Sequence, residues 1–335
     1  VGADCKIGAG AVVTRNIDSH TTVAGVPARS ITKNSNNAFK LKSKIRNLLY
    51  HIRIADFRKL REYNHYVFGK RKLMFLELLS HSWMYGASFE NYYELQFFKK
   101  SRTECRQYLT SSLRHELTRQ VNDPCEALVL KDKVRFSEVF EDILGRRVMT
   151  FDEIKRQMHD PYSISINEVV IKPIKGQAGQ GIIFPMQNFT SLRQLHDYVI
   201  STVKKPDEYL YEERIIQHSA LNKLNPSSLN TLRIVTYNDE SINKVDVWSV
   251  VLRIGIKACT DNFATGGIAA LVDHRGVVCQ PAIIKHPSGE RFHIHPVSGE
   301  KITGCIIPYY DQAIALAKQA AMRIPKVRSI GWDVA

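Results

Sequence analysis

The chain has 335 residues and a formal net charge of +14. Hydrophobic residues make up 44% and charged residues 24%, a mixture that argues against a fibrous or disordered protein and suffices for two globular domains. The sequence has no uninterrupted apolar run of about 18 residues, which argues against a transmembrane helix. The six cysteines are scattered without a Cys-x-x-Cys pair, which argues against a zinc site or disulfide framework and favours a reducing cytoplasm.

The first segment, residues 1–32, carries a six-residue aliphatic repeat. Val1, Ile7 and Val13 lie six positions apart, and a glycine follows the first two. This spacing is typical of a β-helix, in which each strand directs one aliphatic side chain inward. The segment ends in Val-Ala-Gly-Val-Pro-Ala-Arg and resembles the C-terminal coils of serine acetyltransferases and related hexapeptide-repeat acyltransferases. The resemblance implies the end of a left-handed β-helix, acting as a cap or as part of an acyl-CoA groove, with that family's catalytic histidine expected before Val1.

A polar linker at residues 33–38 leads into a basic region at residues 39–122, where apolar residues recur at helical spacing. Between Lys40 and Lys72 there are eleven lysines and arginines against two acidic residues. Three interpretations fit this charge run: a solvated helical face, peripheral contact of residues 40–72 with anionic lipid, or non-specific contact with phosphates.

From residue 123 to residue 335, strand-like runs alternate with helical ones. The spacing predicts strands at 168–172, 209–213, 231–235 and 245–254. It also predicts a helix from Asp311 to Arg323, capped by Asp311 and stopped before Pro325. The pattern indicates an α+β domain with a substantial antiparallel component.

The most informative segment begins at Lys172, which ends a predicted strand and is followed by a loop with three glycines. Glycine lets the backbone approach a ligand closely, so that consecutive N–H groups can face a phosphate. Lys172 alternates with Val169 and Ile171 and therefore projects from the opposite strand face, where its ammonium could hold a phosphate. The loop does not match the Walker pattern, and these residues alone fit an ordinary hairpin turn equally well.

Further motifs follow in a fixed order: YEERIIQH, LNTLRIVTY, DNFATGGIAALVD, HPVSGEKITG and IGWDVA. Together with KPIKGQAGQGI, this series resembles the sugar-transfer-associated ATP-grasp family, which is related to glutamate-ligase-type proteins. The resemblance covers residues 123–335. It implies an ATP-grasp fold of two α+β subdomains, preceded here by the helical region and the β-helix remnant, with ATP and Mg²⁺ as cofactors.

The resemblance also implies which positions contact ATP. Two lysines would lie on either side of the α- and β-phosphates, and the glycine loop would fold over the triphosphate. Two glutamates would lie on the hinge strand, whose backbone receives adenine and whose acid receives the ribose hydroxyls. The segment Asp261–Gly267 joins two predicted strands, and its glycine pair either permits close backbone approach to the substrate or the γ-phosphate or forms an ordinary hairpin turn. These positions are Lys133, Lys172, Gly176, Gly179, Gly181, Glu212, Glu213 and Asn262.

The catalytic candidates are Arg233 and Lys172. Arg233 lies on the strand face opposite Leu232 and Ile234, and an arginine on an otherwise apolar strand needs an anion. The resemblance implies the transferring phosphoryl group as that anion, while a structural salt bridge is the alternative. Arg253 on the following strand is a second possible anion contact.

Asp333 is the predicted metal ligand. It alternates with apolar residues and should face away from the core. The family holds Mg²⁺ with such an aspartate and a Glu-x-Asn pair on the next strand, because Mg²⁺ prefers oxygen ligands. The sequence stops at Ala335 before that pair, so we expect residues 1–335 alone to bind ATP weakly and to show no ligase turnover. His293 and His295 form a weaker candidate metal pair without a visible third ligand.

These expectations point to an ATP- and Mg²⁺-dependent carboxylate ligase. It would phosphorylate a carboxylate and transfer the acyl group to an amine or other nucleophile, in cell-surface polysaccharide assembly as the family name implies. One alternative is a hexapeptide-repeat O-acetyltransferase with a nucleotide-binding appendage. Another is a non-catalytic module whose basic helices dock on membrane or nucleic acid. We expect a cytoplasmic location, with peripheral contact at the inner membrane face as an option, and no specific nucleic-acid partner. The substrate pair and the oligomeric state stay open.

Overall fold

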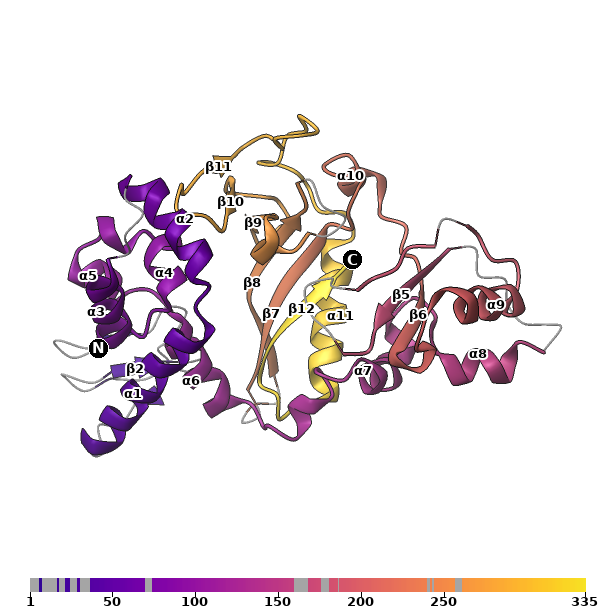
Figure 1. The fold of residues 1–335 in the computed structure, drawn as a ribbon, viewed down its shortest axis with the longest axis horizontal. Helices are drawn as coiled ribbons and strands as arrows, with labels where there is room; N and C mark the ends of the chain where they lie inside the picture. The colour runs from indigo at the N-terminus through magenta and orange to yellow at the C-terminus, as the bar shows by residue number, and fades with distance from the viewer. Residues whose placement is uncertain are drawn as a thin grey trace. The chain divides into compact units, whose positions relative to one another are not determined.

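The computed structural model describes residues 6–7, 17, 22–24, 29–30, 37–69, 74–159, 168–175, 181–185, 187–239, 242, 244–256 and 261–335. The chain folds as two compact units, coloured from indigo to yellow along the sequence in Figure 1. Unit 1 comprises Val1–Val121 together with Lys285–Glu290, and unit 2 comprises Asn122–Ile284 together with Arg291–Ala335. A short segment from late in the sequence therefore belongs to the first unit.

Unit 1 is mainly helical. Its helices are α1 (Asn37–Ile54), α2 (Phe57–Phe68), α3 (Phe75–Tyr85), α4 (Phe89–Glu94), η1 (Phe97–Lys99), α5 (Arg102–Cys105) and α6 (Ser111–Val121). Helix α2 begins after Asp56, whose carboxylate accepts hydrogen bonds from two backbone N–H groups of the first turn, and ends at Gly69 with a φ of 65°. The core of the unit is strongly aromatic and contains Leu60, Leu78, Phe89, Tyr92, Tyr93 and Phe97.

A small sheet of short strands precedes these helices in the sequence. Strand β1 (Lys6–Ile7) pairs in parallel with β2 (Thr22–Ala24), and β2 pairs antiparallel with β3 (Arg29–Ser30). Most residues of the predicted β-helix lie outside the described part of the chain, so the β-helix stays a prediction.

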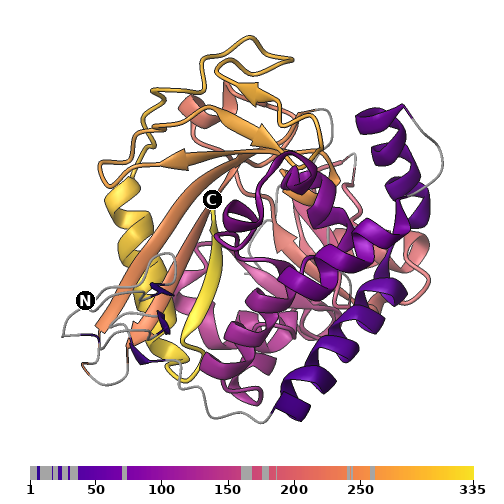
Figure 2. The ribbon, with the colours of Figure 1, turned by 90° about the vertical axis from the view of Figure 1, so that its left-hand side faces the viewer.

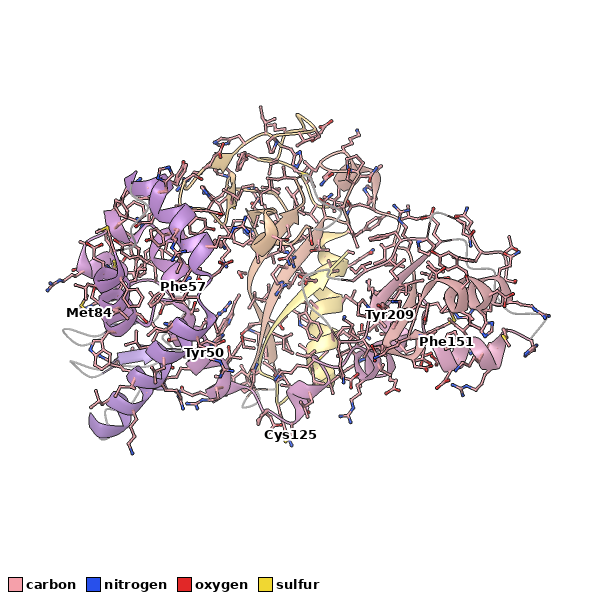
Figure 3. All side chains as sticks on the ribbon, viewed as in Figure 1. Tyr50, Phe57, Met84, Cys125, Phe151 and Tyr209 are labelled. Carbon is pink, nitrogen blue, oxygen red and sulfur yellow. The ribbon has the colours of Figure 1, made fainter. Side chains whose placement is uncertain are left out.

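Unit 2 contains a three-stranded sheet with the strand order β4-β6-β5. Its elements are β4 (Val148–Thr150), β5 (Val169–Pro173), η4 (Pro206–Glu208), β6 (Tyr209–Glu213) and the helices α8 (Phe151–Gln157) and α9 (Leu192–Thr202). Apolar side chains from α8, α9 and the strands form one core, to which Phe151 and Tyr209 contribute (Figure 3). Because Val169 and Ile171 face this core, Lys172 projects from the other face of β5.

Unit 2 also contains a six-stranded antiparallel sheet with the order β11-β10-β9-β8-β7-β12. The strands are β7 (Thr231–Asp239), β8 (Lys244–Ile254), β9 (Ile268–Val272), β10 (Ala282–Ile284), β11 (Arg291–Phe292) and β12 (Ser329–Val334). The remaining elements of the unit are η2 (Glu126–Leu128), α7 (Lys133–Phe140), η3 (Glu141–Ile143), α10 (Ser219–Asn222), η5 (Phe263–Thr265) and α11 (Tyr310–Arg323).

The two faces of this larger sheet differ in polarity. Leu232, Ile234, Leu252 and Trp332 are buried on one face, in the core to which α11 contributes its alanines. Helix α11 lies against this sheet (Figures 1 and 2). The strand pairing sets Arg233 opposite Asp333 and Thr231 opposite Arg253, all on the other face. The alternation predicted for β7 and β12 is therefore present, and it directs charged side chains to one face.

One detail of the predicted helix near the C-terminus is wrong. Helix α11 begins at Tyr310, its N-cap is Tyr309 in the left-handed region with a φ of 53°, and no side chain caps it. Asp311 lies inside the first turn, where its negative charge interacts favourably with the helix dipole, but it is not the N-cap residue of the helix. The helix ends at Arg323, as predicted.

Among the described residues, no helix is both long and apolar enough to cross a bilayer. The described cysteines Cys105, Cys125, Cys279 and Cys305 are free thiols.

Candidate functional site

A cluster of charged side chains lies on the outer face of the three-stranded sheet, around Glu212. The pairing of β5 with β6 places Lys172 diagonally across from Glu212, and Lys172 Nζ donates to Glu212 Oε2 at 2.7 Å. Arg146, just before β4, donates from Nε to the same oxygen at 3.1 Å. Glu212 is only 6% exposed, and burial alone would raise its pKa, but Lys172 and Arg146 outweigh that effect and hold the pKa below its ordinary value. Glu212 is therefore a carboxylate that holds two cations in place.

Lys133 joins this cluster from a different part of the chain. It is the first residue of α7, whose N-cap Asp132 accepts hydrogen bonds from two backbone N–H groups. Lys133 Nζ donates to the carbonyl oxygen of Pro173 at the end of β5, at 2.5 Å. Burial lowers the pKa of Lys133, and the nearby positive charge of Lys172 lowers it further. The structure thus brings together the two lysines for which the family resemblance implies contacts with ATP phosphates.

The glycine loop begins and ends at β5. Ile183 and Ile171 exchange both backbone hydrogen bonds, so the chain returns antiparallel to the strand it left. Gly176 and Gly179 lie outside the described residues. Gly181 has a φ of 72°, and a Cβ there would lie 2.9 Å from Pro173 Cγ, so this position needs glycine. The return of the chain beside Lys172 suits a loop over a ligand as well as a hairpin.

Glu213 has local partners. Its carboxylate accepts a hydrogen bond from the backbone N–H of Arg147 at 2.9 Å, and its own N–H donates to the Arg147 carbonyl. These contacts join β6 to the residue before β4. The role in ribose binding that the resemblance implies for Glu212 or Glu213 stays a prediction.

A second charged cluster lies on the polar face of the six-stranded sheet. Arg233 donates to both oxygens of Asp333, from Nε at 2.7 Å and from Nη2 at 2.9 Å. Arg253 donates from Nη1 to Asp333 at 2.8 Å and from Nη2 to Asp261 at 3.1 Å. Asp261 also accepts from the backbone N–H of Thr231 at 3.1 Å and from the Thr231 hydroxyl. Two arginines and two aspartates thus form one network.

Arg253 is the most enclosed member of this network. Its side chain is 13% exposed, and its buried Nε finds no hydrogen-bond acceptor among the described residues. Burial raises the pKa of Asp261, and the charge of Asp333 acts in the same direction, while Thr231 and Arg253 oppose it. Asp261 and Asp333 are thus the two counter-ions of this enclosed guanidinium group.

Asp333 is a poor cation site in this arrangement. Both of its oxygens accept hydrogen bonds from guanidinium groups, and a Mg²⁺ ion there would have to displace them. Within the described part of the chain, no group of three or more His, Cys, Asp or Glu side chains is placed to hold a metal. The arrangement described here does not fit a metal ion. Magnesium binding at Asp333 was inferred from the family resemblance and stays a prediction.

Asn262 and the glycine pair after it shape a tight turn between β8 and β9. Asn262 Oδ1 accepts from the Ala264 N–H at 3.0 Å and caps η5. Gly266 has a φ of 104°, and a Cβ on Gly267 would lie 2.6 Å from the carbonyl oxygen of Asp261. The turn therefore needs these residues for its own geometry, and a contact of Asn262 with a ligand stays a prediction.

The two histidines of the weaker metal pair have separate partners. His293 Nδ1 lies 3.1 Å from the Thr303 hydroxyl. His295 is buried, with Nε2 2.9 Å from the Gly255 carbonyl and Nδ1 accepting from the Ser298 N–H at 3.1 Å. His295 thus has a structural role, since both of its ring nitrogens are engaged.

Arg146 and the pair of Asp261 with Thr231 are parts of these clusters that the sequence did not identify. Arg146 precedes a strand of only three residues and carries no periodic signal. Asp261 stands in a turn motif, where an aspartate is ordinarily explained by the turn itself.

Comparisons with known proteins give distant structural neighbours. A bifunctional glutathione synthetase from Pasteurella multocida is 15% identical, with a TM-score of 0.31, over 64% of this chain and 30% of that one. The D-alanine–D-alanine ligase from Coxiella burnetii is 9% identical, with a TM-score of 0.25, over 62% of this chain and 58% of that one. The chain thus spans less than two thirds of either protein.

No curated protein matches the chain. The model of the sugar-transfer associated ATP-grasp family matches residues 112–335, well over half of the sequence. This match covers the α+β unit with both charged clusters, which accordingly has the ATP-grasp fold. The chain belongs to the sugar-transfer associated ATP-grasp family.

Proposed function

We propose that this protein is an ATP-dependent carboxylate ligase. The observation that carries the proposal is the meeting of Lys172, Lys133 and Arg146 around Glu212, inside the region that the family model matches. Three basic side chains around one buried carboxylate suit a polyanion such as a triphosphate. Glu212 keeps Lys172 and Arg146 oriented before ATP binds, and the phosphates would then share with Glu212 the pairing to these two cations.

In the proposed reaction, a substrate carboxylate oxygen attacks the γ-phosphorus of ATP, and ADP leaves. An amine or other nucleophile then attacks the carbonyl carbon of the acyl phosphate, and inorganic phosphate leaves. Lys172 and Lys133 would bind the phosphates, and Arg233 would face the transferring phosphoryl group, so the protein acts mainly by positioning and charge stabilisation. Mg²⁺, the cofactor that the family resemblance implies, would neutralise phosphate charge, and no step here depends on it.

The test is nucleotide binding by the full-length protein. We expect Lys172→Ala to weaken ATP binding by at least about tenfold, because a charge-assisted contact to a phosphate is lost. Lys205→Ala is the matched control, since Lys205 is 72% exposed and pairs only with Glu208 on the described surface. Equal affinity of the Lys172→Ala variant and the parent, measured by isothermal titration calorimetry, would contradict the proposal.

The setting in cell-surface polysaccharide assembly is supported by the family description alone. The alternative of an O-acetyltransferase has one observation in its favour: β1 and β2 pair in parallel, as neighbouring coils of a β-helix do. Acetyl-CoA turnover by the full-length protein that survives Lys172→Ala would favour the acetyltransferase. Loss of all acyl-transfer activity with Lys172→Ala would favour the ligase.

We further propose that residues 40–72 contact anionic lipid, and α1 supports this. Residues 37–54 contain no acidic side chain. One stripe of the helix exposes apolar residues and its flanks expose basic ones: Leu41 at 49%, Ile45 at 44% and Leu49 at 61%, beside Lys42, Lys44, Arg46 and Arg53. An apolar stripe bordered by basic side chains is the pattern of a helix that lies in a membrane interface.

The lipid contact is tested by vesicle flotation. We expect binding to vesicles that contain phosphatidylserine but not to pure phosphatidylcholine, and release at high salt. Replacing Leu41, Ile45 and Leu49 together by serine should abolish binding, while Leu76→Ser on α3, a residue 82% exposed, should not. Flotation that is insensitive to the triple replacement would exclude α1 as the contact.

A further inference from the structure

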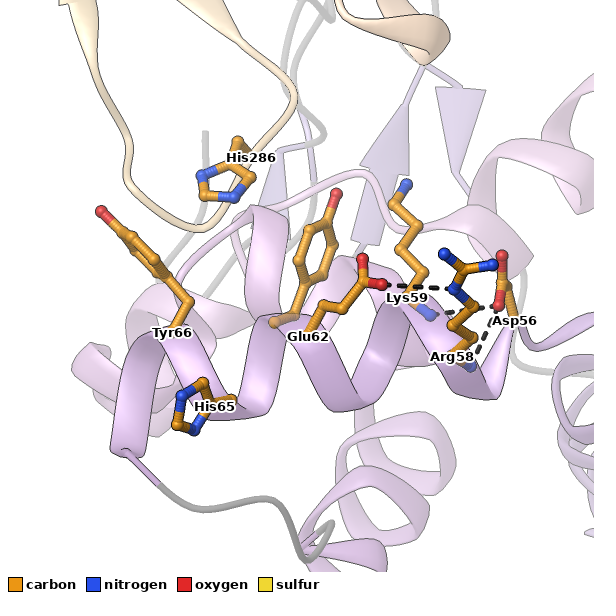
Figure 4. A pocket seen from close by; sticks show the side chains of 8 residues that line it. Asp56, Arg58, Lys59, Glu62, His65, Tyr66 and His286 are labelled. Atoms are coloured by element: carbon orange, nitrogen blue, oxygen red, sulfur yellow. Dashed lines mark hydrogen bonds and ion pairs between the residues drawn. The ribbon is translucent and has the colours of Figure 1, made fainter.

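A cavity of about 730 Å³ lies in the helical unit, far in sequence from the charged clusters of unit 2. It is lined by α2 residues from Asp56 to Tyr66 and by His286 of the segment Lys285–Glu290 (Figure 4). Its volume is in the range of small-molecule sites, about 300–1,000 Å³. The question is which ligand its lining suits.

The segment that carries His286 is held firmly against the helices. Lys285 Nζ lies 3.5 Å from the buried carboxylate of Glu94, and Tyr63 donates from its hydroxyl to the Lys285 carbonyl at 3.3 Å. Gln96 donates from Nε2 to the Pro287 carbonyl at 2.8 Å. The position of His286 in the lining is thus fixed by contacts of the residues immediately before and after it, Lys285 and Pro287.

Three of the four rings that line the cavity, those of Tyr63, Tyr66 and His286, lie close together. The ring centroid of His286 lies 5.4 Å from that of Tyr63 and 4.9 Å from that of Tyr66, at interplanar angles of 90° and 72°. Tyr63 is buried, whereas Tyr66 is 60% exposed. These rings are tilted steeply to one another and do not form a flat slot between parallel faces, while Tyr66 stays largely exposed beside the imidazole.

His286 presents a hydrogen-bond donor. Its Nδ1 accepts from the Ser288 N–H at 3.1 Å. Burial lowers its pKa, and Lys59 acts in the same direction against Glu290, so the ring is neutral near pH 7 and its proton lies on Nε2. This N–H has no partner among the described residues, and neither does the Tyr66 hydroxyl. Two polar groups of the lining are therefore open to a ligand.

The charged residues of the lining already have partners. Arg58 Nε lies 3.4 Å from Glu62, and Lys59 Nζ lies 3.4 Å from Glu94. The Asp56 carboxylate accepts the N–H groups at the start of α2. Two basic and two acidic side chains line the cavity, so neither an anion nor a cation is preferred on charge.

We propose that this cavity binds a neutral saccharide. A pyranose ring has an apolar face of C–H groups that packs on an exposed aromatic face such as that of Tyr66, and hydroxyls that pair with N–H, phenol, carboxylate and guanidinium groups. His286 Nε2, the Tyr66 hydroxyl and the Arg58–Glu62 pair supply such partners along the lining of the cavity. A nucleobase would instead favour a slot between parallel rings. The site is separate from the proposed ATP site and does not depend on it.

The experiment is saturation-transfer NMR on the full chain with methyl α-D-glucopyranoside, methyl β-D-galactopyranoside and N-acetyl-D-glucosamine, and with adenosine as the competing class. We expect saturation of the ring protons of at least one sugar. Tyr66→Ala should weaken that sugar's binding about three- to tenfold, the usual weight of one aromatic contact. Leu76→Ala, an exposed residue of the same unit, should leave it unchanged.

Tyr66→Phe keeps the aromatic ring and removes only the hydroxyl, so this variant should retain most of the sugar binding. Binding by Tyr66→Phe would show that the loss in Tyr66→Ala comes from the missing ring and not from misfolding. Three results would overturn the proposal: no transfer to any of the sugars, transfer that Tyr66→Ala does not change, or adenosine binding that is stronger and equally sensitive to Tyr66→Ala. ATP affinity should be the same in both variants, so failure here leaves the ligase proposal untouched.

Discussion

At the scale of single residues, the pair of Arg253 and Asp261 holds together the polar face of the large sheet. Both side chains are nearly buried, at 13% and 12% exposure. We expect Asp261→Ala to lower the free energy of unfolding by about 3 kcal/mol, because Arg253 loses one buried counter-ion and Thr231 loses its acceptor. Glu168→Ala, which breaks the exposed pair with Arg214, should cost about 1 kcal/mol or less. Urea unfolding followed by tryptophan fluorescence compares the two, and equal losses would refute the expectation.

His51 is a second residue with a measurable consequence. It is buried between the hydroxyls of Ser82 and Ser112, 2.8 Å from Nδ1 and 3.2 Å from Nε2. Burial lowers its pKa from 6.5, with Glu90 opposing and His115 assisting. The unfolded chain therefore binds a proton first as the pH falls, and stability is lost from about pH 6.5 downward until the folded His51 is also protonated.

We expect His51→Gln to flatten this pH dependence in unit 1, because the amide cannot be protonated. Thermal unfolding from neutral pH down to about pH 5 measures it. Parallel curves for the variant and the parent would show that groups other than His51 cause the loss.

At the scale of elements, α8 starts from a capping box that can be tested by itself. The Thr150 hydroxyl accepts from the Glu153 N–H, and the Glu153 carboxylate accepts from the Thr150 N–H. We expect Thr150→Ala to lower the free energy of unfolding by about 1 kcal/mol, because one backbone donor loses its acceptor. Thr150→Ser should keep nearly full stability. Both variants lack the threonine methyl group and differ from each other only in the hydroxyl, so an equal loss in both would point to packing of the methyl group instead.

Helices and strands whose apolar residues recur at a regular spacing could be predicted from the sequence. Contacts between residues far apart in the chain could not. The alternation around Arg233 and Asp333 placed both on the polar sheet face, because side chains alternate along a regular strand and the irregularity in β7 comes only after Val235. The predicted beginning of α11 was wrong because the residue before the helix, Tyr309, has a left-handed backbone conformation and no side-chain cap. A sequence pattern based on capping side chains cannot locate such a beginning. Lys133 and Lys172 were linked only through the family resemblance, since neither periodicity nor charge relates residues so far apart. Arg146 was missed for the same reason.

At the scale of the whole molecule, the segment Lys285–Glu290 belongs to the helical unit although the strands on either side of it belong to the other. Glu94 lies between Lys59 and Lys285, at 3.4 and 3.5 Å, with only 4% of its side chain exposed. Burial raises the pKa of Glu94, and the two lysines oppose that rise.

We expect Lys285→Met to lower the stability of the helical unit by about 1 kcal/mol, a modest value because Lys285 is 37% exposed. Adding Glu94→Gln should restore part of the loss, since the amide no longer needs two cations. A double-mutant cycle on urea midpoints isolates the coupling between the two residues. Strict additivity of the two changes would mean that the ion pair contributes nothing.

This arrangement has a consequence for how the protein can be divided. A polypeptide that stops at Val121 would omit Lys285, the second cation beside Glu94, and Pro287, the acceptor for Gln96. Transplanting the helices into another protein, or exchanging them between relatives by recombination, would require the tip between β10 and β11 to travel with them. A deletion within that tip should accordingly destabilise the helices, the first of which begins about 250 residues earlier in the chain.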